Sequence, residues 1–245
     1  MSLRFRGVAN IVRFNWHFYA ISLVAVLAAV GGALQLSGLA GMTLWLVALT
    51  TVFSTLTSLL VSWYVYDLSG MDRFDWLRLP EQPARRVIQL HAGFDESRRA
   101  LANVVSHADY RVYDFFDPQK HSEVSIRRAR IAYPPDPATV AVDSERLPLE
   151  PGSVDLVALI FSAHEIRDEA ERIRFFRQLA GALAEEGRIL VVEHLRDWRN
   201  FGAFNFGFLH FLSDHTWGQT FSAADLHLES QERPNFFVTA YMLKR

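Results

Sequence analysis

Acidic and histidine side chains stand where the predicted β-strands end. Asp114 and Asp143 each close a short strand, and a continuous apolar strand runs directly into His164 and Glu165. His194 follows the next strand along the chain. Because parallel strands end at one edge of a sheet, these groups are expected to gather beside a ligand. Carboxylates there accept hydrogen bonds, and an imidazole can orient a substrate or remove its proton.

The turn after the first predicted strand, residues 91–97, begins with His91 and contains one glycine, Gly93. Asp114 follows Gly93 by 21 residues. This spacing suits a carboxylate that binds ribose hydroxyls while the glycine lets a nucleotide approach the backbone. A dinucleotide-dependent reductase would use a fuller Gly-x-Gly-x-x-Gly turn. Of the functions considered, the sequence therefore supports a reductase least.

Short apolar strands that alternate with helical stretches must position these residues. This alternation predicts an α/β fold with a doubly wound, mostly parallel sheet. The expected strands are 87–91, 111–114, 139–143, 154–161 and 188–193, followed by a closing pair at 226–231 and 236–243. Helices are expected within 95–107, 118–133 and 169–186, and Gly187 is expected to end the last one.

The middle of the chain resembles a known family. Residues 142–161 (VDSERLPLEPGSVDLVALIF), followed by SAHEI, look like the central part of class I S-adenosylmethionine-dependent methyltransferases. RILVVEHLRD at 188–197 is similar to the fifth strand of their small-molecule, quinone and lipid types. The resemblance covers roughly residues 85–245. It implies a seven-stranded Rossmann-like methyltransferase sheet, an enzyme, and S-adenosyl-L-methionine as its cofactor.

The resemblance also implies roles for individual residues. Gly93, in the loop that His91 begins, would lie by the methionine part of the cofactor, and Asp114 would bind the ribose. Asp143 would face the adenine amino group, and Ser162 would line the far side of the cofactor. His164, Glu165 and His194 would lie near the methyl acceptor. The family usually has two or three glycines in the first loop, which leaves open a catalytically inactive, tethered scaffold protein.

The N-terminal part of the chain is strongly apolar. From Phe14 through Tyr66 there is no Asp, Glu, Lys or Arg. Segments 18–36 and 42–66 are each long enough to cross ~30 Å of hydrocarbon. They predict a transmembrane α-helical hairpin within residues 1–66, a linker at 67–84 and a methyltransferase-like domain at 85–245. Arginines flank the hairpin at both ends (Arg4, Arg6, Arg13, Arg73, Arg78, Arg85 and Arg86), which predicts a two-pass protein with both termini and the domain in the cytoplasm.

The amino-acid composition limits the classes of partner and ligand that are expected. A net charge of −2 gives no electrostatic case for nucleic-acid binding, and the absence of cysteine excludes thiolate metal sites. His210, Asp214 and His215 are loosely spaced, so no metal site is expected. Small residues in the hairpin, such as Gly31, Gly32, Ala33, Ser54 and Ser58, allow self-association into a homo-oligomer.

Residues 200–217 (NFGAFNFGFLHFLSDHTW) carry five phenylalanines and a tryptophan. They form either a helix that covers the sheet or an interfacial flap that contacts the lipid bilayer and admits an apolar acceptor. Together with the hairpin, they predict a membrane-anchored methyltransferase. Its acceptor would be lipid-like or amphiphilic: a phospholipid headgroup, an isoprenoid quinone precursor or a similar molecule.

Overall fold

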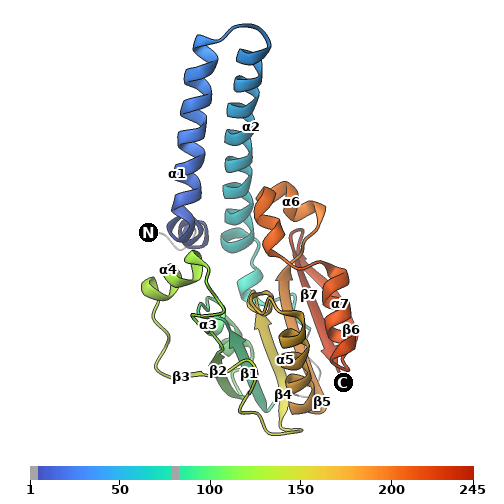
Figure 1. The fold of residues 1–245 in the computed structure, drawn as a ribbon. Coiled ribbons are helices and arrows are strands. Elements are labelled where there is room, and N and C mark those ends of the chain that lie inside the picture. Colours follow the sequence, from blue (N-terminus) through green and yellow to red (C-terminus); the bar gives the residue numbers. More distant parts are fainter. Residues whose placement is uncertain (1–4, 79–82) are drawn as a thin grey trace.

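A long helical hairpin stands on one end of an α/β domain (Figure 1). The computed structural model describes residues 5–78 and 83–245, so Arg4 and residues 79–82 of the predicted linker lie outside the described residues. Helices α1 (Arg6–Gln35) and α2 (Gly38–Trp63) form the hairpin, and a π-helical turn, η2 (Tyr64–Leu68), extends α2.

The hairpin is long and apolar enough to cross a membrane. Its two helices, Arg6–Gln35 and Gly38–Leu68, each reach a mean hydropathy of 1.9. Only 11% and 6% of their most apolar windows are buried inside the structure, unlike the core helix of a soluble domain. The small side chains of Ala29, Ala33 and Ala48 are buried between the two helices. Length, composition and exposure are therefore compatible with a membrane anchor.

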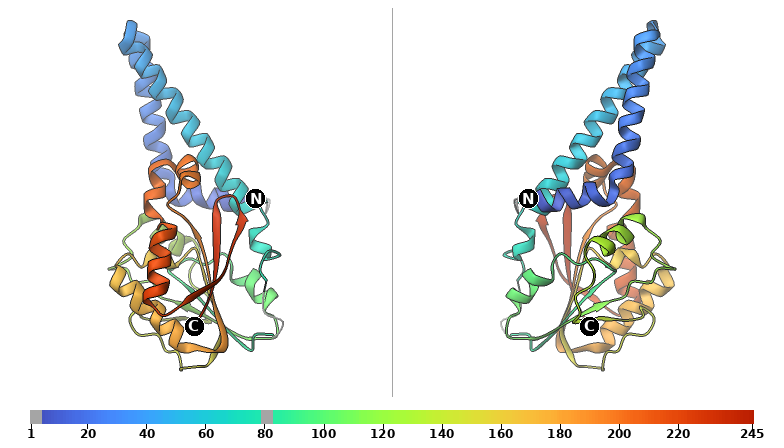
Figure 2. Two further views of the ribbon diagram at one scale, coloured as in Figure 1. Left: turned by 90° about the vertical axis from the view of Figure 1, so that its right-hand side faces the viewer. Right: turned by 90° about the vertical axis from the view of Figure 1, so that its left-hand side faces the viewer.

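Helix α1 begins earlier than the apolar pattern predicts and is bent. Asn15 interrupts it with non-helical backbone angles (φ −113°, ψ 20°). The segment before the bend lies across the end of the α/β domain, and the segment after it rises with α2 (Figure 2). Asp67, just beyond α2, accepts hydrogen bonds of 2.8 Å from the backbone N–H groups of Gly7 and Val8. This carboxylate satisfies two of the unpaired donors that every helix start leaves.

The domain is built on a seven-stranded sheet, as predicted. The strand order is β3-β2-β1-β4-β5-β7-β6, and only β7 runs antiparallel to its neighbours. The expected closing pair is therefore confirmed. The strands are β1 (Arg86–His91), β2 (Asp109–Asp114), β3 (Thr139–Ala141), β4 (Val154–Ile160), β5 (Leu183–His194), β6 (His227–Asn235) and β7 (Val238–Lys244).

Five α-helices and three short 3-10 helices connect the strands within the described part of the domain and its linker. Helix α5 starts at Asp168, whose carboxylate accepts the N–H of Glu171 at 2.7 Å. The prediction that Gly187 ends this helix is wrong, because α5 ends at Ala182 and Gly187 lies in β5. A Cβ atom at Gly187 would stand 2.6 Å from the carbonyl oxygen of Val154, so the glycine permits close strand approach. The helices are α3 (Arg98–Val104), α4 (Val124–Ala132), α5 (Glu169–Ala182), α6 (Trp198–Phe204), α7 (Asp214–Ala223), η3 (Met71–Arg73), η4 (Ala163–Glu165) and η5 (Asn205–His210).

Both faces of the sheet are covered (Figure 2). Helices α5 and α7 bury Phe175, Phe176 and Trp217 against one face. On the other face the residues after the hairpin pack beside α3, and Met71 and Phe74 are almost fully buried. Burial of a large apolar side chain stabilises a fold by about 1.5–3 kcal/mol. Part of the segment predicted as an interfacial linker, around Met71 and Phe74, therefore packs into the domain core.

Candidate active site

The carboxyl ends of β1, β2, β4 and β5 lie at the end of the sheet that faces the hairpin (Figure 1). In open α/β sheets, ligands bind at this edge. Two groups of polar residues gather there in the structure. One surrounds Asp114, at the end of β2, and the other surrounds His164 and Glu165, just after β4.

Asp114 is buried and holds the turn after β1. Its Oδ1 accepts hydrogen bonds from the N–H groups of Gly93, at 2.8 Å, and Phe116, at 3.0 Å. Gly93 has a φ of +89°, which a glycine adopts without strain. The other carboxylate oxygen, Oδ2, is ion-paired with the guanidinium of Arg130, from α4. The structure thus brings the predicted Gly93 and Asp114 together and adds Arg130, which the sequence analysis did not predict.

His91 lies next to the same carboxylate. Its Nδ1 is buried, has no hydrogen-bond partner and stands 3.7 Å from Oδ1 of Asp114. Burial lowers the pKa of His91 more than Asp114 and Asp95 raise it. A neutral imidazole with an unpaired polar atom is therefore available to a ligand at this position.

These residues fit the nucleoside part of S-adenosylmethionine. A buried carboxylate at the end of β2, beside a glycine turn, can accept both ribose hydroxyls. The guanidinium of Arg130 now lies over the ring of Phe116, 4.4 Å from its centre, and against Gly93. Arg130 has a long and partly exposed side chain, so it can withdraw and leave Asp114 to the ribose.

The remaining predicted cofactor residues lie farther along the same edge. Asp143 follows β3, is exposed, and accepts a hydrogen bond from the N–H of Glu145 at 2.8 Å. Ser162 follows β4, is buried, and donates a hydrogen bond of 3.0 Å to the carbonyl of Leu90 in β1. The hydroxyl of Ser162 is thus committed to joining the two central strands.

A chain of alternating carboxylates and imidazoles runs through the second group. Glu193, at the end of β5, lies 2.6 Å from Nδ1 of His164, whose Nε2 lies 3.3 Å from Glu165. Oε1 of Glu165 is also 3.6 Å from Nε2 of His210, and Nδ1 of His210 lies 2.8 Å from Glu123. Glu193 is fully buried, whereas Glu123 is accessible from one side. The chain therefore leads from the sheet to the surface.

In this series of side chains, the carboxylates and imidazoles stabilise each other's charged forms. Burial lowers the pKa of His164, but the carboxylates of Glu193 and Glu165 outweigh burial and raise it to about 10. Burial acts to raise the pKa of Glu165, yet hydrogen bonds with His164 and His210 hold it well below its usual range. At neutral pH His164 is therefore a cation, and Glu165 is the anion that can accept a hydrogen bond from an acceptor hydroxyl.

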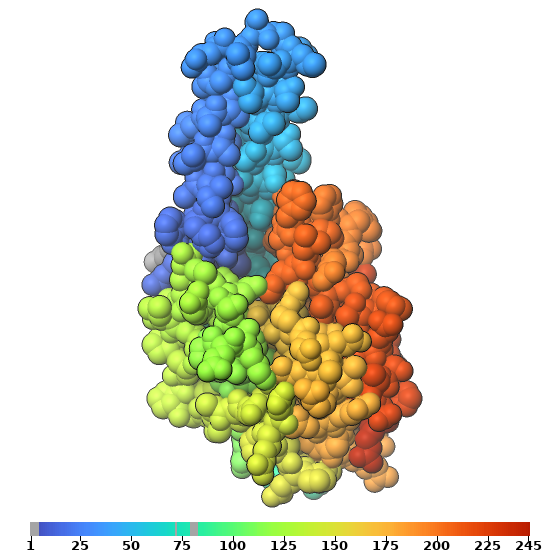
Figure 3. Space-filling view, in the orientation of Figure 1, coloured from blue at the N-terminus to red at the C-terminus, as the bar shows by residue number. Residues whose placement is uncertain are grey.

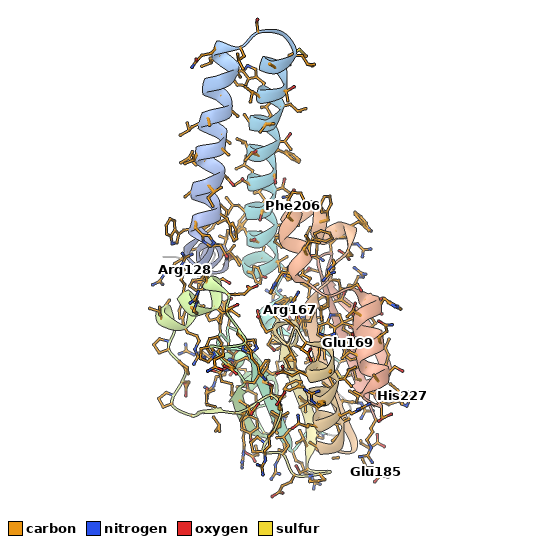
Figure 4. All side chains as sticks on the ribbon, in the orientation of Figure 1. Arg128, Arg167, Glu169, Glu185, Phe206 and His227 are labelled. Atoms are coloured by element: carbon orange, nitrogen blue, oxygen red, sulfur yellow. The ribbon has the colours of Figure 1, made fainter. Side chains whose placement is uncertain are left out.

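Arg167 fixes the relative position of the two histidines. Its guanidinium donates to the backbone carbonyls of both His164 and His210. Figure 4 labels Arg167 at the carboxyl edge, below the hairpin. The 3-10 helices η4 and η5, which end at Glu165 and His210, are thereby held together.

His194 lies apart from this chain, on the opposite face of β5. Its Nε2 is 3.0 Å from the hydroxyl of Tyr66, and its Nδ1 is 3.1 Å from the carbonyl of Phe237. The ring stacks between Phe161 and Phe211. The structure thus places His194 at the junction of the hairpin and the domain, with both ring nitrogens hydrogen-bonded within the protein.

Besides Arg130, the sequence predictions do not include three members of the second group: Glu123, Glu193 and His210. Glu193 directly precedes the predicted His194, but β5 is apolar on both sides, so the pattern does not show which of the two side chains faces the site. His210 was considered only with Asp214 and His215. In the structure, Asp214 accepts a hydrogen bond from Tyr241 at 2.6 Å and His215 is exposed. Little in the sequence points to Glu123, because it precedes a polar helix and lies far from His164 in the sequence.

Comparison with known proteins agrees with this geometry. Residues 94–191 match the family model described as "Methyltransferase domain". No curated protein matches the sequence. Among solved structures, the mitomycin 7-O-methyltransferase MmcR superposes with a TM-score of 0.57 at 15% identity, covering 99% of this chain and 73% of its own.

Two further solved structures share the fold. Human N-acetylserotonin methyltransferase, in complex with S-adenosylmethionine, has a TM-score of 0.52 at 12% identity and covers 80% of this chain and 58% of its own. A methyltransferase from Aquifex aeolicus has a TM-score of 0.50 at 14% identity and covers 72% and 93%. The family model, the strand order and the similar solved structures lead to one conclusion: residues 94–191 match a methyltransferase domain, and the chain has the fold of S-adenosylmethionine-dependent methyltransferases.

Proposed function

We propose that the protein is a membrane-anchored methyltransferase whose acceptor is a lipid-soluble or amphiphilic molecule, such as a phospholipid headgroup or an isoprenoid quinone precursor. The proposal rests on the positions of the ligand-binding edge and the hairpin. The ligand-binding edge of the sheet and the foot of the apolar hairpin lie at the same end of the domain (Figure 1). An acceptor held in a bilayer would meet the site without leaving the membrane surface.

A second apolar surface lies beside the hairpin and supports the proposal. Helix α6 and η5 expose four large apolar side chains, Trp198, Phe201, Phe206 and Leu209. Figure 3 shows this part of the chain (orange) standing against the foot of α2, and Figure 4 labels Phe206 there. Exposed aromatic rings of this kind favour the water–lipid interface. We define these four residues as the aromatic patch; Phe201, Phe206 and Leu209 belong to the segment 200–217, and Trp198 lies just before it.

The site residues divide the work of methyl transfer. The cofactor supplies an activated methyl group when it is bound. Asp114 binds its ribose and Gly93 leaves room for its backbone contacts. His164 and Glu165 orient the acceptor, with the Glu165 carboxylate accepting a hydrogen bond from the attacking group. Positioning of this kind supplies much of the rate enhancement of a displacement reaction.

The direct test is methyl transfer from isotopically labelled S-adenosylmethionine. Purified full-length protein would be incubated with a lipid extract, and the labelled product would be identified by mass spectrometry. Label in a lipid-soluble product supports the proposal. Label confined to water-soluble products, with robust cofactor binding, would refute the acceptor class.

The proposed topology places both termini and the domain in the cytoplasm. Because the chain has no cysteine, single substitutions can report on each side. Ser37→Cys lies in the hairpin turn and Ser106→Cys on the exposed side of the domain. In intact cells, a membrane-impermeant thiol reagent should label Ser37→Cys and spare Ser106→Cys. The reverse pattern would overturn the orientation.

A catalytically inactive, membrane-tethered binding protein is the second candidate. Arg130 favours it, since this side chain fills the space beside Gly93 and Asp114. Asp114→Ala separates the two functions. An enzyme loses cofactor affinity and transfer activity together, whereas a scaffold keeps its cellular role.

A further inference from the structure

His164, Glu165 and His210 form a three-sided cluster at the carboxyl edge of the sheet. Their ligand atoms all lie within 4.8 Å of one another. Nε2 of His164 and Nε2 of His210 approach the same oxygen, Oε1 of Glu165, at 3.3 Å and 3.6 Å. Two ligands on one tetrahedral ion, with bonds of about 2.1 Å, stand about 3.4 Å apart. The three atoms are thus spaced as ligands of a single cation.

The other nitrogen of each histidine carries a second, independent observation. Nδ1 of His164 pairs with Glu193 at 2.6 Å, and Nδ1 of His210 pairs with Glu123 at 2.8 Å. Histidines that bind metals usually donate the far ring N–H to a carboxylate in this way. The pairing fixes both rings so that Nε2 faces inward, toward Glu165. Two rings oriented alike by separate carboxylates are the arrangement that a metal site requires.

Charge and access complete the argument. A metal ion would displace the Nε2 protons of His164 and His210, and Glu123, Glu165 and Glu193 would then leave three negative charges around it. Glu165 and His164 are buried, whereas His210 is partly exposed. An ion there would therefore keep an open position on the solvent side.

We propose that His164, Glu165 and His210 bind one divalent transition-metal ion, with Glu193 and Glu123 orienting the two histidines. Two imidazoles and one carboxylate suit zinc, iron(II), cobalt or manganese better than magnesium or calcium. Binding replaces the ring protons that now face Glu165, so it releases protons into solution. The ion's presence does not depend on the proposed function; only its use, to hold an oxygen of the acceptor beside the cofactor, rests on that function.

The experiment uses full-length protein in detergent after treatment with a chelator. Zinc, cobalt and magnesium would be added separately, and bound metal measured by mass spectrometry after gel filtration. We expect about one zinc or cobalt per chain, little magnesium, and proton release in weakly buffered solution. His164→Ala and His210→Ala should each lower zinc affinity by at least about 10-fold.

Two variants keep the test decisive. Glu123→Gln removes only an orienting carboxylate on the accessible side, so it should fold and still weaken zinc binding by about 10–100-fold. His215→Ala removes an exposed histidine outside the cluster and should bind zinc as the unaltered protein does. Zinc binding that is absent, or that is equal in all these variants, would overturn the proposal.

Calorimetry with S-adenosylmethionine on the same preparation distinguishes this proposal from the proposed function. Cofactor binding without zinc binding removes the metal site and leaves the methyltransferase function standing. Zinc binding without cofactor binding would support the metal site and refute the proposed methyltransferase function.

Discussion

The side-chain amide of Asn10, in helix α1, donates a hydrogen bond of 2.6 Å to the carboxylate of Glu96, in the loop after β1. The oxygen of the same amide accepts a hydrogen bond of 2.9 Å from Tyr133. Phe14 packs edge-on against Phe94, one residue beyond Gly93. The foot of the hairpin therefore contacts the loop that is predicted to receive the methionine part of the cofactor.

The first prediction concerns this contact. Asn10→Ala removes a buried amide, so Glu96 loses its donor and Tyr133 loses its acceptor. A net hydrogen bond contributes about 0.5–1.5 kcal/mol, so the two together are worth about 1–3 kcal/mol. We expect a loss of that size in the free energy of unfolding, measured by denaturant titration in detergent. Val12→Ala, at a more exposed position of the same segment, should change stability by less than about 0.5 kcal/mol.

The second prediction concerns Arg130. Arg130→Ala removes the cation that competes with ribose for Asp114, so cofactor affinity should rise several-fold. The same change should lower the stability of the cofactor-free protein, because Asp114 loses its ionic partner. Calorimetry and thermal unfolding measure the two effects. Arg127→Ala, on an exposed side of α4, is the matched control. A fall in affinity with Arg130→Ala would show that the guanidinium contributes to cofactor binding.

The third prediction concerns the joint between the hairpin and the domain. Tyr66→Phe keeps the ring but leaves Nε2 of the buried His194 without its partner. A cost of about 1–3 kcal/mol in unfolding free energy is expected. Tyr64→Phe provides the comparison, since Tyr64 is more exposed and keeps its ring contact with Phe237. Equal stability of the two variants would exclude a structural role for the hydroxyl of Tyr66.

The fourth prediction is a pH dependence of stability. Burial lowers the pKa of His194 from 6.5 to about 4. Between these values the unfolded chain binds more protons than the folded protein, so the free energy of unfolding falls as the pH falls. His194 alone contributes about 3 kcal/mol to this loss. His194→Asn should flatten the curve between pH 6.5 and pH 4, whereas the exposed His215→Asn should leave its slope unchanged.

The fifth prediction tests the aromatic patch. Trp198→Ser and Phe206→Ser remove its two most exposed rings. Each should reduce transfer to an acceptor embedded in vesicles by several-fold, and leave S-adenosylmethionine affinity unchanged. Leu228→Ser exposes a hydroxyl on β6, away from the hairpin, and serves as the control. Unchanged rates in both patch variants would remove the patch from the acceptor argument.

Much of the fold could be predicted because strand and helix patterns are local. The apolar run at 154–161 and the alternation of elements gave the parallel sheet and its antiparallel closing pair. Segment 67–84 was harder, since its burial depends on contacts with strands far along the chain. Asn15 gave no local sign that α1 bends, because the bend follows from packing on α4 and the loop after β1.

The site residues also differ in how well the sequence predicts them. Gly93 and Asp114 follow from strand ends and spacing, and their hydrogen bond confirms that they meet. Glu123, at the start of α4, and His210, in η5, meet His164 and Glu165, in η4, only after these three segments have folded together. The positions of these residues in the sequence do not indicate that they lie close together in the fold. Glu193 faces His164 and His194 faces Tyr66, and an apolar strand covered on both faces does not reveal this pleat in the sequence.

Both helices of the hairpin are attached to the domain. Helix α1 is tied to the loop after β1 through Asn10 and Glu96, and the end of α2 is tied to β5 through Tyr66 and His194. Two attachments on different strands prevent the domain from swivelling about a single joint. In a bilayer, the height of the ligand edge above the lipid would then be constant. Acceptors would be distinguished by the depth of their reacting atom, since only atoms at that height could reach the cofactor.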